Sequence, residues 1–143
     1  MSDAPDFLTL EDVLLIHDES LARYGGGAGM RDVGALESAV AMPQAGFGGQ
    51  FLHEDLFAMA AAYAFHIAQN QPFVDGNKRA GLGAALVFLD LNGVEIPDRD
   101  GRLYDAMIAL AERRLDKPGL AELLRTLTRG AGGGAGPSPG STR

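Results

Sequence analysis

One short segment of the chain, QPFVDGNKR at positions 71–79, brings together side chains that can bind phosphate. An apolar run follows it, so a helix is expected to begin near Asn77, with its free N–H groups and the positive end of its dipole at this point. Lys78 and Arg79 add full positive charge, and arginine can grip a phosphate group with a fork of donors. Gly76 lets a ligand approach the backbone closely, and the Asn77 amide can donate to an anion without adding charge.

Asp75 is the one acidic residue of this segment, and it would repel a bare phosphate group. It would favour phosphate if it held a divalent cation that bridges to the phosphate oxygens. The residue types together therefore indicate a Mg²⁺-nucleotide or another phosphorylated ligand. A simpler interpretation stays open on these residues alone: Asp75 caps a helix after a turn, and Lys78 and Arg79 lie in its solvated first turn.

Two apolar stretches flank the segment and must position it. Residues 54–70 and about 77–92 are apolar nearly all round, a pattern typical of helices buried at the centre of a domain. Further helices are expected from Thr9, over residues 32–42 and 99–115, and from about residue 116. The fold class predicted is all-α: a compact helical bundle around two buried central helices.

The connecting segments carry weaker signals. Gln44–Leu52 holds three glycines and two phenylalanines, which predicts an extended loop or a short hairpin. Arg31 and Asp32 are expected to form an internal ion pair or a helix cap. Residues 129–143, RGAGGGAGPSPGSTR, are rich in Gly, Pro and Ser without a hydrophobic pattern, so a disordered tail is expected after a domain of residues 1–128.

The amino-acid composition of the chain excludes several classes of function. The 143 residues are enough for one domain with a single core, and the absence of cysteine excludes disulfides, thiolate zinc sites and cysteine nucleophiles. A formal net charge of −7 argues against broad binding to nucleic acid or to anionic membranes, because both reward clustered Lys and Arg. With no signal-peptide pattern at the N-terminus and no apolar run long enough to span a bilayer, a soluble cytoplasmic protein is expected.

Residues 72–79, PFVDGNKR, resemble the signature of the Fic/Doc (Fido) family, in its death-on-curing (Doc) branch. The likeness covers most of the chain, from about Leu8 to Arg125, in the right order. The other matching segments are residues 10–17 with the branch's opening helix, 30–39 with its second helix, 43–49 with the loop before the core, and 86–93 with the end of the motif helix.

The resemblance implies a compact Fic/Doc fold and an enzyme that transfers part of a nucleotide to a side-chain hydroxyl of a target protein. In the Doc branch a lysine, here Lys78, stands where most Fic proteins have glycine, and such proteins are associated with transfer of the terminal phosphate of ATP. They are toxins of toxin–antitoxin pairs, and their known target is the elongation factor that delivers aminoacyl-tRNA. A cognate antitoxin and a translation factor are the partners implied, and Gln44–Leu52 would be the flap that positions a target segment.

The resemblance also implies roles for the residues of the segment. Asp75 would hold Mg²⁺. Gly76 and Asn77 would line a phosphate cradle. Lys78 and Arg79 would neutralise the charge of the phosphates. These implied roles agree with the chemistry expected from the residue types.

At Gln71 the resemblance fails, because a histidine directly precedes the Pro-Phe pair in the family. That histidine is the general base that takes the proton of the target hydroxyl, and imidazole suits the task because its pKa lies near neutrality. A glutamine amide can hydrogen-bond a hydroxyl or a phosphate, but it cannot remove a proton. Loss of a general base costs about 10²–10⁴ in rate, whereas positioning and charge stabilisation can sustain some phosphoryl transfer.

Several interpretations of Gln71 stay open. The protein is a transferase with slow or altered chemistry, or one whose acceptor, such as a small molecule, needs no base. It is a non-catalytic module that binds a nucleotide or a partner. Alternatively, the glutamine was introduced to silence a toxin. The sequence does not distinguish among them.

None of the three histidines is predicted to replace the missing base. His66 lies on the third helix, on a different side from Gln71, and is expected to pack in the core. His53 is expected on a surface loop, and His17 is expected to be a packing residue of the first helix. The glycine run at 25–29 follows a helix and not a strand, so it is not a dinucleotide-binding fingerprint.

Overall fold

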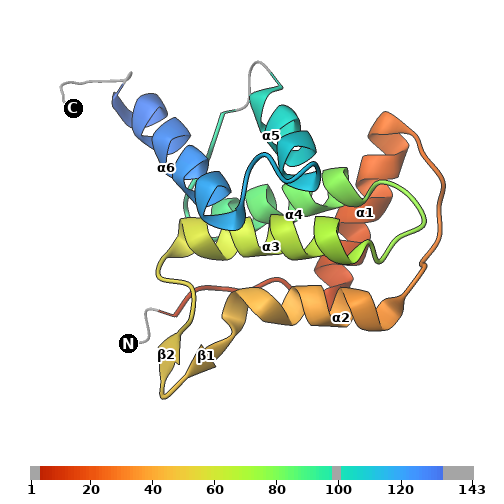
Figure 1. Cartoon of the computed structure of the whole chain (residues 1–143), viewed down its shortest axis with the longest axis horizontal. Helices are drawn as coiled ribbons and strands as arrows, with labels where there is room; N and C mark the ends of the chain where they lie inside the picture. The colour runs from red at the N-terminus through yellow and green to blue at the C-terminus, as the bar shows by residue number, and fades with distance from the viewer. Residues whose placement is uncertain (1–3, 98–100, 134–143) are drawn as a thin grey trace.

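Two helices that run in opposite directions form the centre of the computed structural model, which describes residues 4–97 and 101–133. These helices are α3 (Leu56–Asn70) and α4 (Asn77–Leu91), and they lie against one another along their length (Figure 1). Small side chains make the approach close. A Cβ atom at Gly81 of α4 would lie 2.8 Å from the carbonyl oxygen of Ala64 on α3, so glycine is required there. The prediction of two buried central helices is confirmed.

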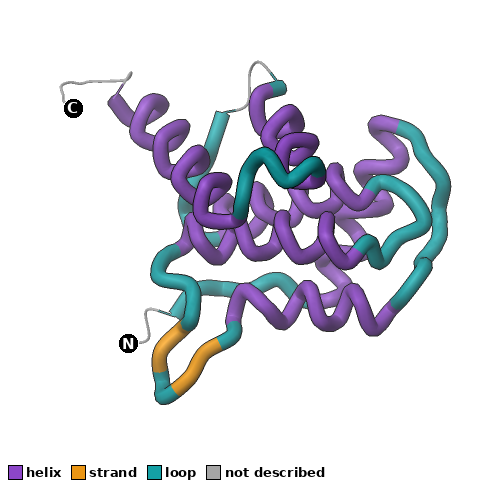
Figure 2. Tube along the Cα trace, in the orientation of Figure 1, coloured by secondary structure: helices purple, strands orange, loops and turns teal. Residues whose placement is uncertain are grey.

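The other helices surround this pair, and the described part of the chain consists mainly of helices joined by loops and a short hairpin (Figure 2). They are α1 (Leu10–Tyr24), α2 (Val33–Ala41), the 3-10 helix η1 (Met42–Gln44), α5 (Arg102–Ala111) and α6 (Lys117–Gly133). Polar side chains cap the starts of α1, α2 and α3. Thr9 and Asp12 form a reciprocal capping box on α1, and Asp32 and Asp55 accept from backbone N–H groups of α2 and α3. The all-α prediction is confirmed, and Asp32 is a helix cap, one of the two roles expected for it.

The segment before α3 forms the short hairpin that was one of the two predicted alternatives. Strands β1 (Gly46–Phe47) and β2 (Gln50–Phe51) pair antiparallel, with Gly46 opposite Phe51. The hairpin lies beside the first turn of α3, whereas Gln71 lies at the other end of that helix (Figure 1). A helix of this length spans about 22 Å. In this structure the hairpin therefore does not adjoin residues 71–79, where the family resemblance implied a target-binding flap.

Two helix ends differ from the sequence prediction. Helix α5 is shorter than residues 99–115, because the chain leaves it at Glu112 and Arg113 adopts a left-handed backbone with φ 64°. Helix α6 continues to Gly133, past the predicted start of the tail at residue 129, since glycine weakens a helix without stopping it. The rest of the predicted tail, residues 134–143, lies outside the described residues. Within the described residues, no helix has the length and apolar character needed to cross a membrane.

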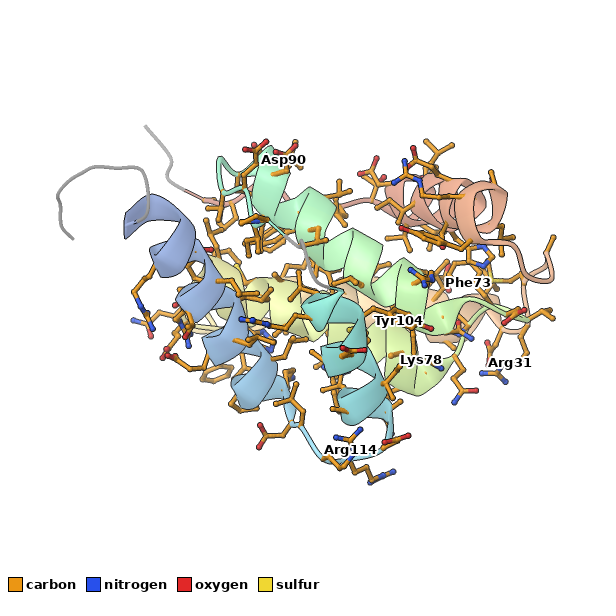
Figure 3. All side chains as sticks on the ribbon, turned by 90° about the horizontal axis from the view of Figure 1, so that it is seen from above. Arg31, Phe73, Lys78, Asp90, Tyr104 and Arg114 are labelled. Atoms are coloured by element: carbon orange, nitrogen blue, oxygen red, sulfur yellow. The ribbon has the colours of Figure 1, made fainter. Side chains whose placement is uncertain are left out.

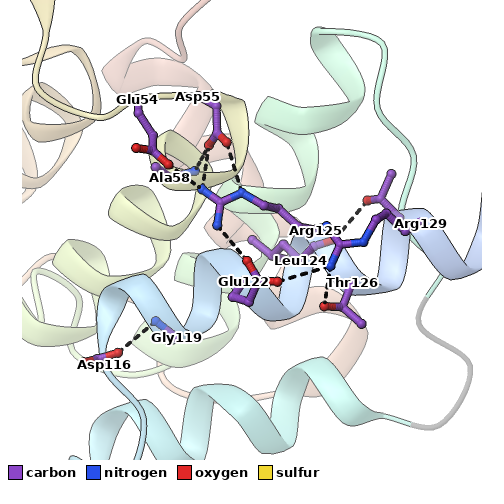
Figure 4. A network of polar contacts seen from close by, with 11 residues as sticks. Glu54, Asp55, Ala58, Asp116, Gly119, Glu122, Leu124, Arg125, Thr126 and Arg129 are labelled. Carbon is purple, nitrogen blue, oxygen red and sulfur yellow. Dashed lines mark hydrogen bonds and ion pairs between the residues drawn. The ribbon is translucent and has the colours of Figure 1, made fainter.

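Arg125 joins α6 to the start of α3 (Figure 4). Its Nε and Nη2 atoms donate to the two carboxylate oxygens of Asp55 at 3.0 and 3.1 Å, and its Nη1 donates to Glu122 at 3.1 Å. Asp55 also caps α3 through the N–H of Ala58. The same carboxylate thus starts the central helix and holds α6 over it, while Leu120 and Leu124 bury the apolar face of α6.

A cluster of three basic side chains lies where α6 begins. The Lys117 ammonium is 3.0 Å from Nε2 of His66 and 3.3 Å from Nε2 of His53. Burial and the Lys117 charge lower the pKa of His66 to about 4, and the same two causes lower the pKa of His53. Both rings are therefore neutral at pH 7 and can accept from Lys117. His53 is buried, so the prediction of a surface-loop histidine was wrong, because its ring turns inward beneath α6.

This cluster predicts a loss of stability in mild acid. The unfolded His66 ring takes up a proton near pH 6.5, whereas the folded ring does so only near pH 4. As the pH falls from 6.5 to 4, the unfolded state binds more protons and the free energy of unfolding decreases, by roughly 1–2 kcal/mol for this half-buried group. Urea unfolding at several pH values measures the effect. His66→Gln, which can still accept from Lys117, should flatten the curve in this window; parallel curves for the two proteins would contradict the assignment.

Candidate functional site

The turn between α3 and α4 is closed by one side chain, that of Asn77. Its Oδ1 accepts from the Phe73 N–H and its Nδ2 donates to the Phe73 carbonyl, both at 3.0 Å. Pro72 and Phe73 are buried, which ties the turn to the core. The Asn77 side chain is therefore occupied within the turn. It can contribute to a phosphate cradle through its backbone N–H, but its side chain is not free for the role predicted from the sequence.

Gln71 ends α3 in a left-handed conformation, with φ 49° and ψ 58°. This backbone is uncommon for a residue other than glycine, and a neighbouring arginine holds it. Arg31 donates from Nε to the Gln71 carbonyl at 2.6 Å and from Nη2 to the Asn70 carbonyl at 2.7 Å. Arg31 is thus a cap for the end of α3, one of the two roles expected for it. The side chain of Gln71 is exposed at the mouth of the turn.

The glycine run at 25–29 lies directly against this turn, although the two are far apart in the sequence. Val74 N–H donates to the Gly29 carbonyl at 3.0 Å, and the N–H groups of Arg31 and Asp32 donate to the Pro72 carbonyl at 2.7 and 3.0 Å. Gly26 and Gly29 have positive φ values of 120° and 124°, which side chains rarely adopt. The sequence showed only that this run is not a nucleotide fingerprint; it gave no sign that the run forms one wall of the site.

Asp75 lies exposed between the two segments with both carboxylate oxygens hydrogen-bonded. Oδ2 accepts from the Gly27 N–H at 3.0 Å and Oδ1 from the Gly76 N–H at 2.8 Å. These two backbone bonds, and then the charge of Lys78, lower the pKa of Asp75. The carboxylate is therefore ionised at neutral pH, and each oxygen keeps a lone pair for a cation.

A Mg²⁺ ion bound with a nucleotide fits this arrangement. Mg²⁺ commonly uses one or two carboxylates and completes its shell with water and substrate phosphates. The described residues contain no cluster of three or more metal-binding side chains, so a cation here would need the phosphates as further ligands. Asp75 is the residue that would hold it, as predicted from the sequence.

The start of α4 supplies the positive side of the site. Gly76 precedes the helix with φ 78°, and no side chain caps the first turn. The N–H groups of this turn and the helix dipole are therefore available to an anion. Lys78 lies half-buried at this end of α4 (Figure 3). The structure thus brings Asp75, Gly76 and Lys78 together, as the sequence predicted.

Arg79 points elsewhere. Its guanidinium lies between the aromatic rings of Tyr24 and Tyr104, from α1 and α5. It lines a cavity of about 600 Å³ between α1, α4 and α5 whose lining does not include Asp75 or Lys78. The sequence grouped Arg79 with Lys78 because they are neighbours, but successive helix residues point in directions about 100° apart.

The side chain of His17 packs against the turn between α3 and α4. Its ring stacks on Phe73 with centroids 3.7 Å apart and an angle of 5° between the planes. Its Nε2 lies 2.8 Å from the Asp75 carbonyl, and since a carbonyl can only accept, Nε2 carries a proton and donates. The packing role predicted for His17 is confirmed, and its contact with the backbone of Asp75 is new. With His53 and His66 bound to Lys117, no described histidine takes the place of a base beside Gln71.

The chain is similar to known proteins of one family. The model of the Fic/DOC family matches residues 7–89. A protein of Escherichia phage P1 named Protein kinase doc is 35% identical over 117 residues, which cover 82% of this chain and 91% of that protein. A protein of Mycolicibacterium smegmatis named Toxin Doc is 41% identical over 118 residues, which cover 81% of this chain and 88% of that protein.

The Arg31 cap predicts that the turn loses stability when the cap is removed. Arg31→Ala should lower the free energy of unfolding by about 1–2 kcal/mol, because two hydrogen bonds from a charged donor are lost at an exposed position. Arg31→Lys is the matched control. Lysine keeps the positive charge but lacks the paired donors of the guanidinium, so it should restore only part of the lost free energy of unfolding. Urea unfolding of the three proteins measures the difference, and equal stabilities would show that Arg31 does not hold this helix end.

Proposed function

Because the chain belongs to the Fic/DOC family, we propose that it is a Doc-like toxin that binds Mg²⁺-ATP and transfers the terminal phosphoryl group to a hydroxyl of a protein, such as a translation factor. The names of two relatives, a protein kinase and a toxin, support this proposal. The observation that carries it is the meeting of the ionised Asp75, the uncapped start of α4 and Lys78 within one turn of helix. A cognate antitoxin and a cytoplasmic site of action belong to the same proposal.

Each of these groups has a distinct task in the proposed reaction. Asp75 binds the cation, and the N–H groups of the first turn of α4 hold phosphate oxygens. Lys78 neutralises charge that grows on the phosphate oxygens during transfer. Mg²⁺, when bound, polarises the terminal phosphate. Phosphoryl transfer depends mainly on such positioning and charge stabilisation, which these residues can supply without an ionisable group at Gln71.

The bonds of the step are those of an in-line displacement. The acceptor oxygen forms a bond to the terminal phosphorus of ATP, and the bond from that phosphorus to the bridging oxygen breaks. ADP leaves with the electron pair. The proton of the acceptor hydroxyl passes to water, because the Gln71 amide can accept a hydrogen bond from the hydroxyl but cannot take its proton. The step is therefore expected to be slow with a simple hydroxyl acceptor.

A non-catalytic binding module is the second candidate, and the surroundings of Gln71 favour it. No described histidine adjoins this position, and the Nε2 proton of His17 is occupied by the Asp75 carbonyl. Such a protein would bind the nucleotide or a partner protein and act by occupancy alone. A transferase with a small-molecule acceptor that needs no base is the remaining alternative.

Restoring a base at position 71 tests catalysis. Gln71→His should increase the transfer of labelled phosphate from ATP to protein in a lysate by about 10²–10⁴, with stronger growth arrest on expression. Histidine tolerates the left-handed backbone of this position, so the fold should be kept. Gln71→Asn is the matched control, because it suits the same backbone and does not titrate. A histidine variant without transfer or growth arrest would favour the binding module.

Removing the charged groups tests the nucleotide site itself. ATP with Mg²⁺ should raise the Tm of the unchanged protein, by an amount that corresponds to about 2.7 kcal/mol at a hundredfold excess over Kd. Asp75→Ala and Lys78→Ala should each remove most of this stabilisation. Arg114→Ala is the control, because its exposed guanidinium pairs with Glu112 away from the turn. Stabilisation by ATP that persists in the first two variants would contradict the phosphate cradle.

A further inference from the structure

The amine of Lys117 lies between two imidazole rings that come from a distant part of the chain. Its Nζ is 3.0 Å from Nε2 of His66 and 3.3 Å from Nε2 of His53. His66 belongs to α3 and His53 to the segment before it, whereas Lys117 is the first residue of α6. Two nitrogens that can accept a proton therefore converge on one amine, an arrangement typical of an activated nucleophile.

No acidic group balances the charge of this amine. Among the residues that the structure describes, Lys117 forms no ion pair with a carboxylate. Its neighbour Asp116 accepts from the Gly119 N–H, and Glu54 pairs with Arg125. Burial lowers the pKa of Lys117. A larger share of this amine is therefore uncharged at neutral pH than in an exposed lysine, and the uncharged form is the nucleophile.

The two rings leave one side of the amine open. An ammonium group has three N–H donors, and the imidazoles accept two of them. The third has no hydrogen-bond acceptor in the part of the chain that the structure describes, and the centroid of the Phe65 ring is 5.6 Å away. Lys117 also lines a cavity of about 280 Å³, together with Leu52, Pro118 and Arg125. A small molecule in this cavity can reach the lone pair that the nitrogen carries once the third proton is lost.

We propose that Lys117 is a site of covalent modification, at which the amine takes the acyl group of a small acyl phosphate. This inference goes beyond the proposed function and does not involve the nucleotide site. An acyl phosphate brings its own good leaving group, so the protein has to supply a nucleophile and a proton acceptor. The cavity is at the small end of the range for ligand pockets, which suits a donor of this size.

The reaction is an acyl transfer through a tetrahedral adduct. The Lys117 ammonium first loses its third proton to water. The lone pair of Nζ then forms a bond to the carbonyl carbon of the acyl phosphate, the bond from that carbon to the bridging oxygen breaks, and phosphate leaves with the electron pair. Nε2 of His66 accepts the extra proton of the nitrogen and passes it to water, because a neutral imidazole has a lone pair for it.

The rate of acylation at each lysine tests this proposal. Lys117 and Lys78 are the two lysines of the chain, so mass spectrometry after treatment with acetyl phosphate resolves each of them. Near neutral pH, Lys117 should react at least about tenfold faster in the folded protein than in the same chain unfolded in guanidinium chloride. In the unfolded chain the two lysines should react within about twofold of one another. An amine that is merely buried reacts more slowly when the protein is folded, so an equal or lower rate at Lys117 overturns the proposal.

Replacing the imidazoles separates activation from burial. The double variant His53→Gln/His66→Gln keeps two hydrogen-bond acceptors beside Lys117, but neither amide can take a proton. The rate at Lys117 should fall by about tenfold or more, with the rate at Lys78 unchanged within about twofold. Circular dichroism checks that the fold is kept, and an unchanged rate at Lys117 in a folded variant overturns the proposal. The comparison of the folded and unfolded chain needs no variant, so it decides the matter if the double variant does not fold.

The acylated protein offers an independent measurement. Burial, the Lys117 charge and His53 together lower the pKa of His66 to about 4. The amide that forms on acylation carries no charge, so one of these causes is removed and the pKa of His66 should rise. NMR titration of the His66 ring before and after acylation measures the change. An unchanged pKa would contradict the contact between Lys117 and His66 on which the proposal rests.

Discussion

The close approach of α3 and α4 is the constraint on which the rest of the structure depends. Gly81 lets the backbones come together where a Cβ atom would meet the Ala64 carbonyl. The chain between the adjoining ends of these helices is the short turn of residues 71–76, which carries the candidate site. A larger residue at position 81 would separate the helices and move the start of α4 away from Gln71.

A second chain segment then fixes the turn in place through its backbone. The glycine run at 25–29 and the residues that follow it hydrogen-bond to Pro72, Val74 and Asp75. Backbone contacts hold Asp75 in one orientation and stabilise its ionised form at the same time. His17 adds a stacking surface and a hydrogen bond from below. The acidic group of the site is thus rigid before any ligand arrives, which reduces the entropic cost of binding.

The charged groups of the candidate site and the position where the family has its proton acceptor belong to different residues. Asp75, Lys78 and the uncapped start of α4 lie together at one turn, while Gln71 carries no titratable group. The two histidines other than His17 lie with Lys117 under α6, where burial keeps them neutral. The chain belongs to the Fic/DOC family, and Gln71 stands directly before the Pro-Phe pair of its motif.

Local patterns in the sequence determined the helical class, the two central helices, the helix start at Thr9, and the acid–glycine–lysine grouping at the start of α4. Each of these depends on residues that are near one another along the chain, so periodicity and residue type were enough. The tertiary structure alone decided that the glycine run forms a wall of the site, that His53 is buried, and that the hairpin lies at the far end of α3. It also placed the side chain of Asn77 inside the turn and the guanidinium of Arg79 between the rings of Tyr24 and Tyr104. These outcomes depend on contacts between distant segments and on the direction in which each side chain leaves its helix, and neither is encoded in local spacing.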